Sequence, residues 1–372
     1  MRKFTILHTI ETAGPGGAET IVLNLASQLD RSRFRSVVLL TREDWLSQKL
    51  RERDVPTFFV DSRAWYDLRL PLGMARLIRK EKVDLIHSHL PGQNFYSCVV
   101  RRLTGCKTIV TYHGEIELSR SGGVRGAIQL GWVRRSADAV VVVCDHIGQM
   151  LRDAAFPAEK IVRIYNGISV EKFQVPADGR LRRELALRNG AKLVGMVANL
   201  RETKGYEFFI QAARKVSDTM PETRFVAVGD MDPVIAKPLL GSIERLGLQD
   251  RFIFLGFRSD VPEILSDLDV FVLSSVSEGF PLVTLEAMAA AKPVVVTRSG
   301  GPQEIVEDGR TGVLVPPADP DALAERICEL LANPERAAAL ARAARAKVES
   351  TFTLEKMISD YERLYERLMS SG

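Results

Sequence analysis

The strongest chemical signal lies in a loop that precedes an apolar, helix-like segment. The loop reads Ser277-Glu278-Gly279-Phe280-Pro281, and the segment after it contains Glu286. Backbone amides from Gly279 to Val283 at the start of a helix can bind an anion, because the helix dipole adds positive charge there. The two glutamates suit the hydroxyl groups of a sugar and a ribose better than the phosphate itself. The alternative is that neither glutamate binds a ligand: Glu278 would cap the helix, and Glu286 would be an acidic residue of the first turn that the helix dipole stabilises.

Two further loops could contact phosphate. Gly14-Pro15-Gly16-Gly17-Ala18-Glu19 separates a strand-like run from a helix-like run, and its glycines would let backbone amides approach an anion. Its spacing is not that of a dinucleotide or P-loop motif, so a tight turn is an equal alternative. The segment from 198 to 205 carries Asn199, Arg201 and Lys204, and the arginine and the lysine could neutralise a diphosphate. An ordinary solvated loop is the alternative there.

Histidines follow two other strand-like runs. His113 precedes Gly114 at a strand end, where it could donate a hydrogen bond to a ligand or serve a structural role. His87 and His89 are two residues apart, on one face of a strand. No third residue has metal-ligand spacing with them, so we predict no metal site.

Short apolar runs alternate with helical patterns twice along the chain, which is typical of parallel βαβ units. The predicted strands are 5–10, 36–40, 83–88, 108–112 and 139–143, then 193–198, 224–228, 252–255, 270–273 and 293–297. A polar stretch at 175–190 separates the two series. We therefore predict an α/β protein with two Rossmann-like, doubly wound parallel-sheet domains facing a cleft. They span 1–175 and 176–350, with a helical tail at 351–372 that packs back on the first domain.

Composition excludes several classes of protein. The 372 residues are 46% hydrophobic and 26% charged, with a net charge of +4, too weak a bias to indicate nucleic acid. The four cysteines lack metal spacing and are expected to be reduced, as in a cytoplasmic protein. No apolar run approaches the ~18 residues of a spanning helix, so any membrane contact would be peripheral.

Six motifs between 254 and 317, and one before the polar stretch, resemble glycosyltransferase family four, whose members have the GT-B fold. They are Leu255-Gly256-Phe257, Asp269-Val270-Phe271-Val272, Glu278-Gly279-Phe280-Pro281, Leu285-Glu286-Ala287-Met288, Gly300-Gly301-Pro302-Gln303-Glu304, Asp308-Gly309-Arg310-Thr311-Gly312 and Asn166-Gly167-Ile168. The resemblance covers nearly the whole chain.

The resemblance implies three catalytic residues. His113 would contact the transferred sugar, Lys204 would bind the diphosphate, and Glu278 would hold sugar hydroxyls. It also implies that Glu286 contacts the nucleotide ribose. The remaining donor-binding positions are Gly16, Gly17, Asn199, Arg201, Gly279, Phe280, Pro281, Leu282 and Val283.

Two segments depart from the family pattern. Asn199 stands where the family commonly has a phosphate-binding arginine, and Arg201 is the candidate to replace it. Gly229-Asp230-Met231-Asp232 replaces a Gly-Asp-Gly-Pro segment near the base and contains an Asp-x-Asp sequence.

The resemblance implies a retaining, metal-independent hexosyltransferase that needs no cofactor, because the nucleotide sugar is its substrate. A UDP-sugar is the favoured donor and GDP-mannose the second, with a glycan or lipid-linked acceptor in cell-surface polysaccharide synthesis. A sugar-nucleotide epimerase and an inactive partner subunit are the alternatives. The basic, amphipathic stretch 119–135 favours peripheral contact with the inner face of a membrane, unless it is an ordinary surface helix.

Overall fold

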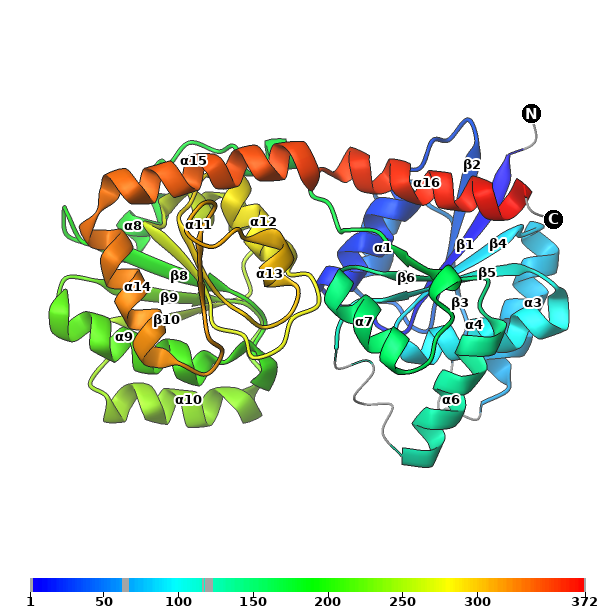
Figure 1. Cartoon of the computed structure of the whole chain (residues 1–372), viewed down its shortest axis with the longest axis horizontal. Coiled ribbons are helices and arrows are strands. Elements are labelled where there is room, and N and C mark those ends of the chain that lie inside the picture. The colour runs from blue at the N-terminus through cyan, green and yellow to red at the C-terminus, as the bar shows by residue number, and fades with distance from the viewer. Residues whose placement is uncertain (1–2, 62–66, 116, 118–122, 371–372) are drawn as a thin grey trace. The chain divides into compact units, whose positions relative to one another are not determined.

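The computed structural model describes residues 3–61, 67–115, 117 and 123–370. These residues form two compact units, each with its own parallel sheet and flanking helices (Figure 1). The first unit comprises Met1–Asn166 and Leu354–Gly372, and the second comprises Gly167–Thr353. The predicted boundary at 175 lies beyond this division, because the short helix η2 (Val170–Phe173) packs against helices of the second unit.

The first unit contains a seven-stranded sheet in the order β3-β2-β1-β4-β5-β6-β7, with every neighbouring pair parallel. Its strands are nearly continuous apolar runs, as expected when helices cover both faces of a sheet. The strands are β1 (Phe4–Ile10), β2 (Phe34–Leu40), β3 (Thr57–Phe59), β4 (Leu85–His89), β5 (Lys107–Tyr112), β6 (Ala139–Val142) and β7 (Ile161–Arg163). The helices are α1 (Gly17–Gln28), α2 (Trp45–Arg51), α3 (Arg69–Glu81), α4 (Pro91–Thr104), α6 (Gly123–Ser136), α7 (Asp145–Asp153), η1 (Ala158–Lys160) and α16 (Leu354–Ser370).

The second unit contains a six-stranded parallel sheet in the order β10-β9-β8-β11-β12-β13. The strands are β8 (Leu193–Val197), β9 (Arg224–Val228), β10 (Phe252–Gly256), β11 (Val270–Leu273), β12 (Val294–Thr297) and β13 (Val313–Val315). The helices are α8 (Arg180–Glu184), η3 (Glu202–Lys204), α9 (Tyr206–Thr219), α10 (Pro233–Arg245), α11 (Val261–Asp267), α12 (Leu282–Ala289), α13 (Pro302–Ile305), α14 (Pro320–Ala332) and α15 (Pro334–Thr351). The two doubly wound parallel sheets confirm the predicted α/β class.

The C-terminal helix α16 belongs to the first unit. Met357, Tyr361, Leu364 and Tyr365 are buried at helical spacing, so one apolar face packs on the unit. At its polar margin Glu362 accepts a hydrogen bond from the Asp30 amide at 2.7 Å and pairs with Arg33.

Each sheet reverses its strand order once, between β1 and β4 in the first unit and between β8 and β11 in the second. Loops at the carboxyl ends of strands diverge at such a point and leave room for a ligand. The loops with the predicted site residues follow strands β1, β5, β8 and β11, at or next to these positions. None of the described helices is both long and apolar enough to cross a bilayer.

Candidate active site

In the second unit, the loops after β8 and β11 bring Lys204 and Glu278 into direct contact. The Lys204 Nζ lies 2.6 Å from the Glu278 Oε1, and the Ser275 hydroxyl donates to the same oxygen at 2.6 Å. The Glu278 side chain is 8% exposed and the Lys204 side chain 22%. A cation and a carboxylate that were predicted to bind different parts of one donor thus share a half-enclosed position at the reversal of the sheet.

Backbone packing holds these two loops together. Gly205 follows Lys204 with φ +61, and a Cβ there would lie 2.3 Å from the Ser274 carbonyl oxygen. The Ser274 hydroxyl donates to the carbonyls of Lys204 and Gly205, and the Val276 amide donates to the Thr203 carbonyl at 2.8 Å. Glycine is therefore required beside the lysine because the β11 loop lies against it.

A glycine pair after β12 supports the loop of Glu278 from its other side. The Glu278 amide donates to the Ser299 carbonyl at 2.8 Å, and the Gly301 amide donates to the Glu278 carbonyl at 3.2 Å. A Cβ on Gly301 would lie only 1.5 Å from the Gly279 carbonyl oxygen. The Gly300-Gly301 motif is thus explained by the close approach of two backbones.

Helix α12 begins directly after this loop, with Pro281 as its N-cap residue. The first amides of a helix have no partner within it and carry partial positive charge, so Leu282 and Val283 lie where an anion would be stabilised. Phe280 is buried and packs edge-on against Phe352. Glu286 lies one turn into α12, and part of its surface remains accessible to solvent. Loss of water around its carboxyl group raises the pKa to about 7, although the positive charge of Lys172 has the opposite, smaller effect. Its carboxyl group therefore takes up a proton at a higher pH than an ordinary glutamate does.

The Asn199 side chain contacts the backbone of the loop after β9. Its Oδ1 accepts a hydrogen bond from the Asp230 amide at 2.9 Å, which ties the loop after β8 to the loop after β9. A Cβ on Gly229 would lie 2.1 Å from the Ala198 carbonyl oxygen, so these loops also meet backbone to backbone. Arg201 is exposed to solvent at the start of η3.

In the first unit, His113 follows β5, and Gly16 and Gly17 follow β1. Gly17 begins α1 with open space where a Cβ would be, whereas a Cβ on Gly16 would lie 2.4 Å from the Glu19 carboxylate. The His113 Nε2 lies 2.9 Å from the His89 Nδ1, with the rings stacked. Burial lowers the pKa of His113 to about 4, so the ring is neutral at pH 7.

Sequence reasoning missed His8. On β1 it is in register with His87 on β4, and one ring nitrogen from each of His8, His87 and His89 lies within 4.8 Å of the other two. All three rings are fully buried. The parallel pairing of β1 and β4 supplies this third histidine, 79 positions before His87 in the chain, beyond the reach of a spacing rule.

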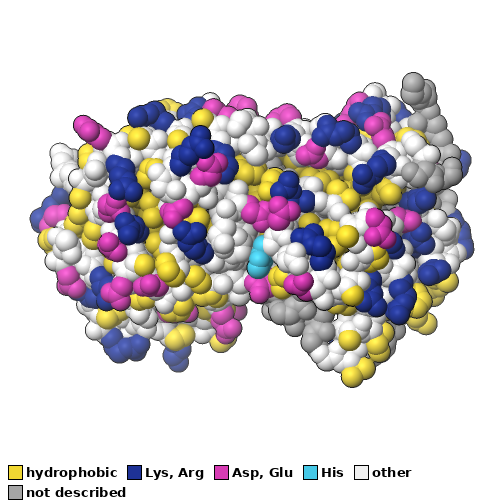
Figure 2. Space-filling view, viewed as in Figure 1, with side chains coloured by type: hydrophobic (Ala, Val, Ile, Leu, Met, Phe, Trp, Pro, Cys, Tyr) yellow, Lys and Arg dark blue, Asp and Glu magenta, His cyan; other side chains and the backbone are white. Residues whose placement is uncertain are grey.

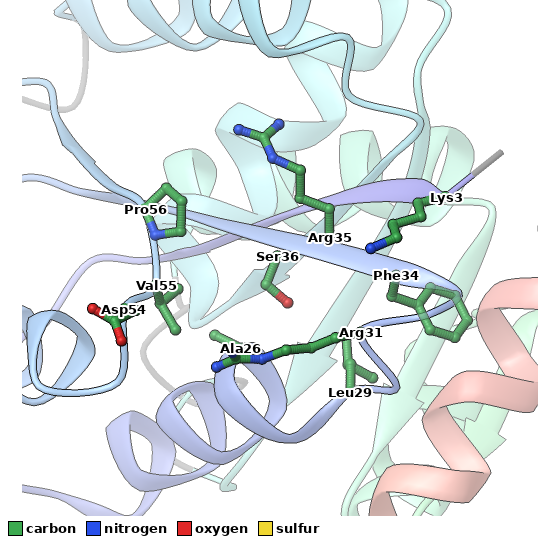
Figure 3. A pocket seen from close by; sticks show the side chains of 10 residues that line it. All are labelled: Lys3, Ala26, Leu29, Arg31, Phe34, Arg35, Ser36, Asp54, Val55 and Pro56. Carbon is green, nitrogen blue, oxygen red and sulfur yellow. The ribbon is translucent and has the colours of Figure 1, made fainter.

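A separate hollow of about 210 Å³ lies at the amino ends of β1 and β2 (Figure 3). Lys3, Arg31 and Arg35 line it together with Asp54 and apolar side chains. It is at the wrong end of the strands for the predicted donor residues, which lie in the loops beyond the carboxyl ends.

Two protein-family profiles match the chain in succession. Residues 15–172 match Glycosyltransferase Family 4, and residues 178–347 match Glycosyl transferases group 1. The alpha-D-kanosaminyltransferase of Streptomyces kanamyceticus is 30% identical over 281 residues, which cover 69% of this chain and 70% of that protein. This chain belongs to glycosyltransferase family four. The glycosyltransferase activity predicted from the sequence is thereby confirmed.

Two further proteins are similar to this glycosyltransferase over nearly its full length. One is the UDP-Gal:alpha-D-GlcNAc-diphosphoundecaprenol alpha-1,3-galactosyltransferase of Escherichia coli, 27% identical, covering 98% of this chain and 97% of that protein. The other is Anabaena HepE, whose crystal structure contains UDP and glucose. It is 24% identical, with a TM-score of 0.90 over 98% of this chain and 100% of that chain. This likeness confirms the GT-B fold of the glycosyltransferase.

Proposed function

We propose that this glycosyltransferase moves a sugar from a nucleoside-diphosphate donor with retention of anomeric configuration and without a metal ion. The observation that carries the proposal is the contact between the Lys204 ammonium group and Glu278 beside the start of α12. An ammonium group suits the diphosphate, and a carboxylate suits the sugar hydroxyls. Their contact would place the bond between these two parts of the donor next to both groups.

Stabilisation of the leaving diphosphate is the main catalytic contribution that we propose. Negative charge grows on the phosphate oxygen as its bond to the anomeric carbon breaks. Lys204 and the first amides of α12 would stabilise that charge, as fixed donors do at developing oxyanions. In the first unit, the amides at Gly16 and Gly17 are proposed to bind donor phosphate, and neutral His113 to donate a hydrogen bond to the sugar.

The contacts of Glu278 favour attack from the face that the diphosphate leaves. Its Oε1 already accepts hydrogen bonds from Lys204 and Ser275, which makes the carboxylate a poor nucleophile for a covalent intermediate. In the step that we propose, an acceptor hydroxyl oxygen bonds to the anomeric carbon as the phosphate oxygen departs. The hydroxyl proton moves to that departing oxygen, and the configuration is retained.

The contacts of the Asp-x-Asp sequence in the loop after β9, Asp230-Met231-Asp232, support metal independence. The Asp232 carboxylate caps α10 by accepting from the Val234 amide at 2.8 Å, and the Asp230 amide is bound by Asn199. Asp232 thus has a helix-capping role that needs no cation. Activity that survives a chelator would agree with the proposal, and activity restored only by added divalent ions would contradict it.

For the donor we propose a UDP-sugar first and GDP-mannose second. The name of the Escherichia coli relative specifies UDP-Gal, and that protein matches this chain from end to end. Calorimetry with UDP and GDP tests the nucleotide, and failure of both to bind would favour the inactive partner subunit. A sugar-nucleotide epimerase would release rearranged sugar from the donor alone, so incubation without acceptor tests that alternative.

For the acceptor we propose a lipid-linked glycan at an anionic membrane surface, reached through α6. Val124, Ile128 and Trp132 are exposed at a spacing of four residues and form one apolar stripe. Figure 2 shows apolar side chains at the outer end of this helix. The stripe is not the buried face of the helix, which is formed by Gly126, Val133 and Ser136. Residues 119–122 of the basic stretch 119–135 lie outside the described residues.

Charge complementarity supports an anionic membrane as the surface that this stripe contacts. The first unit holds 28 of the 51 lysines and arginines but only 21 of the 47 acidic residues, so it is basic, whereas the second unit is acidic. A basic surface around an apolar stripe is attracted to anionic lipid. Sedimentation with vesicles of anionic lipid should be reduced by Ile128→Gln combined with Trp132→Gln. Val234→Gln, on an exposed apolar side chain of α10, is the control, and equal sedimentation of all variants would contradict the proposal.

A further inference from the structure

Four of the five histidines in the chain form a row across the sheet of the first unit. His8 on β1, His87 and His89 on β4, and His113 after β5 lie next to one another in that order. The ring centroids are 5.7, 4.2 and 5.1 Å apart in sequence along the row. Burial lowers the pKa of every one of these rings, so each is neutral at pH 7 and carries one proton on one of its two nitrogens.

The hydrogen bonds of the row differ from ring to ring. Both nitrogens of His87 are bonded, one to the Tyr365 hydroxyl and one to the Thr111 hydroxyl, each at 2.7 Å. His89 uses its Nδ1 for His113. Within the described residues, the His89 Nε2 and the His8 Nδ1 are buried without a partner.

These contacts argue against a cation at the three-histidine cluster. His87 has no nitrogen to spare, so only two of the three histidines could act as ligands without breaking a buried hydrogen bond. The three ligand candidates are neutral and include no carboxylate, so they would leave the charge of a divalent ion unbalanced in the core.

The unpartnered nitrogen of His89 determines which way the bond to His113 runs. If the proton of His89 were on Nε2, a buried N–H would have no acceptor, which is the costlier arrangement in a protein interior. If the proton is on Nδ1, only a lone pair is left without a partner, and Nδ1–H donates to His113. We infer that His89 is a positioning residue, which donates from Nδ1 to the His113 Nε2 and so holds the proton of His113 on Nδ1.

This tautomer has a direct consequence at the proposed site. His113 can only offer a hydrogen-bond donor to a ligand through Nδ1, because Nε2 is occupied as an acceptor. The inference therefore deepens the proposed function, and it rests on that function for the role of His113 toward the sugar. His87 supports the arrangement, because its two hydroxyl partners hold its ring 4.2 Å from that of His89.

The tautomer can be measured directly on the full chain by 15N NMR of the histidine rings at neutral pH. We expect the His113 spectrum of a protonated Nδ1 and an unprotonated Nε2. A protonated Nε2 would overturn the inference, whatever the enzyme's activity. This measurement uses no substrate, so it is independent of the proposed function. If His113→Ala leaves transfer unchanged while the tautomer is as stated, the sugar contact fails and the tautomer assignment stands.

Two substitutions of His89 test its positioning role. His89→Leu removes the donor and should reduce turnover by about tenfold to a hundredfold, by analogy with the loss of partners that orient metal-bound histidines. It should also abolish the single-tautomer spectrum of His113. His89→Asn keeps an amide donor near the position of Nδ1 and should restore both. Ile86→Ala, on the opposite face of the same strand, controls for lost core packing and should lower thermal stability without changing the His113 spectrum. Unchanged turnover and spectrum in His89→Leu would refute the positioning role.

Discussion

Lys204 Nζ and Glu278 Oε1 lie 2.6 Å apart although 74 residues separate them in the chain. The cation that we assign to the diphosphate is therefore paired with the carboxylate that we assign to the sugar. A donor that contacts both groups must bind against this pair. Substitutions of the two residues should consequently have coupled rather than additive effects on donor binding and turnover.

Removal of the cation is the first test of this arrangement. Lys204→Ala should lower turnover by roughly two to three orders of magnitude, by analogy with the loss of one donor to a developing oxyanion. Steady-state kinetics of sugar transfer provides the measurement. Lys237→Ala, on the exposed side of α10, is the control and should behave as wild type. Normal turnover in Lys204→Ala would remove this residue from the mechanism.

Neutralising the carboxylate should separate binding from chemistry. Glu278→Gln keeps the shape of the side chain but frees Lys204 from its ion pair, so affinity for the free nucleotide diphosphate should be kept or increased. Turnover should nevertheless fall, because the amide is a weaker acceptor for the sugar hydroxyls. Calorimetry with UDP and kinetics on the same preparation distinguish the two effects. Parallel losses of UDP affinity and turnover would contradict the roles assigned here.

Gly301 should be intolerant of any side chain. A Cβ at this position would lie 1.5 Å from the Gly279 carbonyl oxygen, so Gly301→Ala must displace the loop that carries Glu278. We expect a loss of at least about tenfold in donor affinity, corresponding to about 1.4 kcal/mol. Gly241→Ala on α10 meets only the flexible end of Arg245 and should be harmless. Equal donor affinity in the two variants would show that the loop does not need this approach.

Glu286 should make donor binding depend on pH near neutrality. Burial raises its pKa to about 7, so the carboxylate that would accept ribose hydroxyls is lost as the pH falls below that value. Donor affinity should therefore weaken between about pH 8 and pH 6, and Glu286→Gln should flatten this dependence. Because the folded-state pKa is raised, the contribution of Glu286 to stability is present below its unfolded pKa and is lost as the pH rises through 7. An affinity profile identical to wild type in Glu286→Gln, measured by calorimetry, would contradict the assignment.

The bond between α16 and the histidine row should contribute to the stability of the first unit. Tyr365→Phe removes the hydroxyl 2.7 Å from His87 Nδ1 and leaves a buried ring nitrogen without its partner. The free energy of unfolding should fall by about 1–3 kcal/mol. Urea denaturation measures the change, with the partly exposed Tyr165→Phe as control. A change no larger than that of the control would show that this bond does not anchor the helix.

The sequence predicted long apolar strands well and short ones poorly. The strands missed were β3, β7 and β13, each of three residues, because such runs contain too few positions to show a period. The loops at strand ends were predicted because glycine, lysine and glutamate follow apolar runs directly. Their contacts were not, because sheet order decides which loops meet. The pairing of Lys204 with Glu278 and the alignment of His8 with His87 both depend on strands that are neighbours in space and distant in sequence.

Asn199 illustrates a different limit of sequence reasoning. Asn199 replaces the phosphate-binding arginine that the family commonly has, and the structure gives it a hydrogen bond from the Asp230 amide. A substitution away from a family pattern can thus reflect local backbone geometry. If exposed Arg201 supplies the missing charge, Arg201→Ala should weaken donor binding and exposed Arg188→Ala should not.

Because α16 belongs to the first unit, that unit is discontinuous in the chain, and this affects the order in which the two units can finish folding. The second unit is a continuous segment that ends at Thr353, so all of its residues are synthesised before those of α16. The first unit is synthesised earlier yet must wait for Tyr365 to cover His87. The half of the protein made first is therefore finished last, and stalling or truncation within the final helix should leave its histidine core open to water.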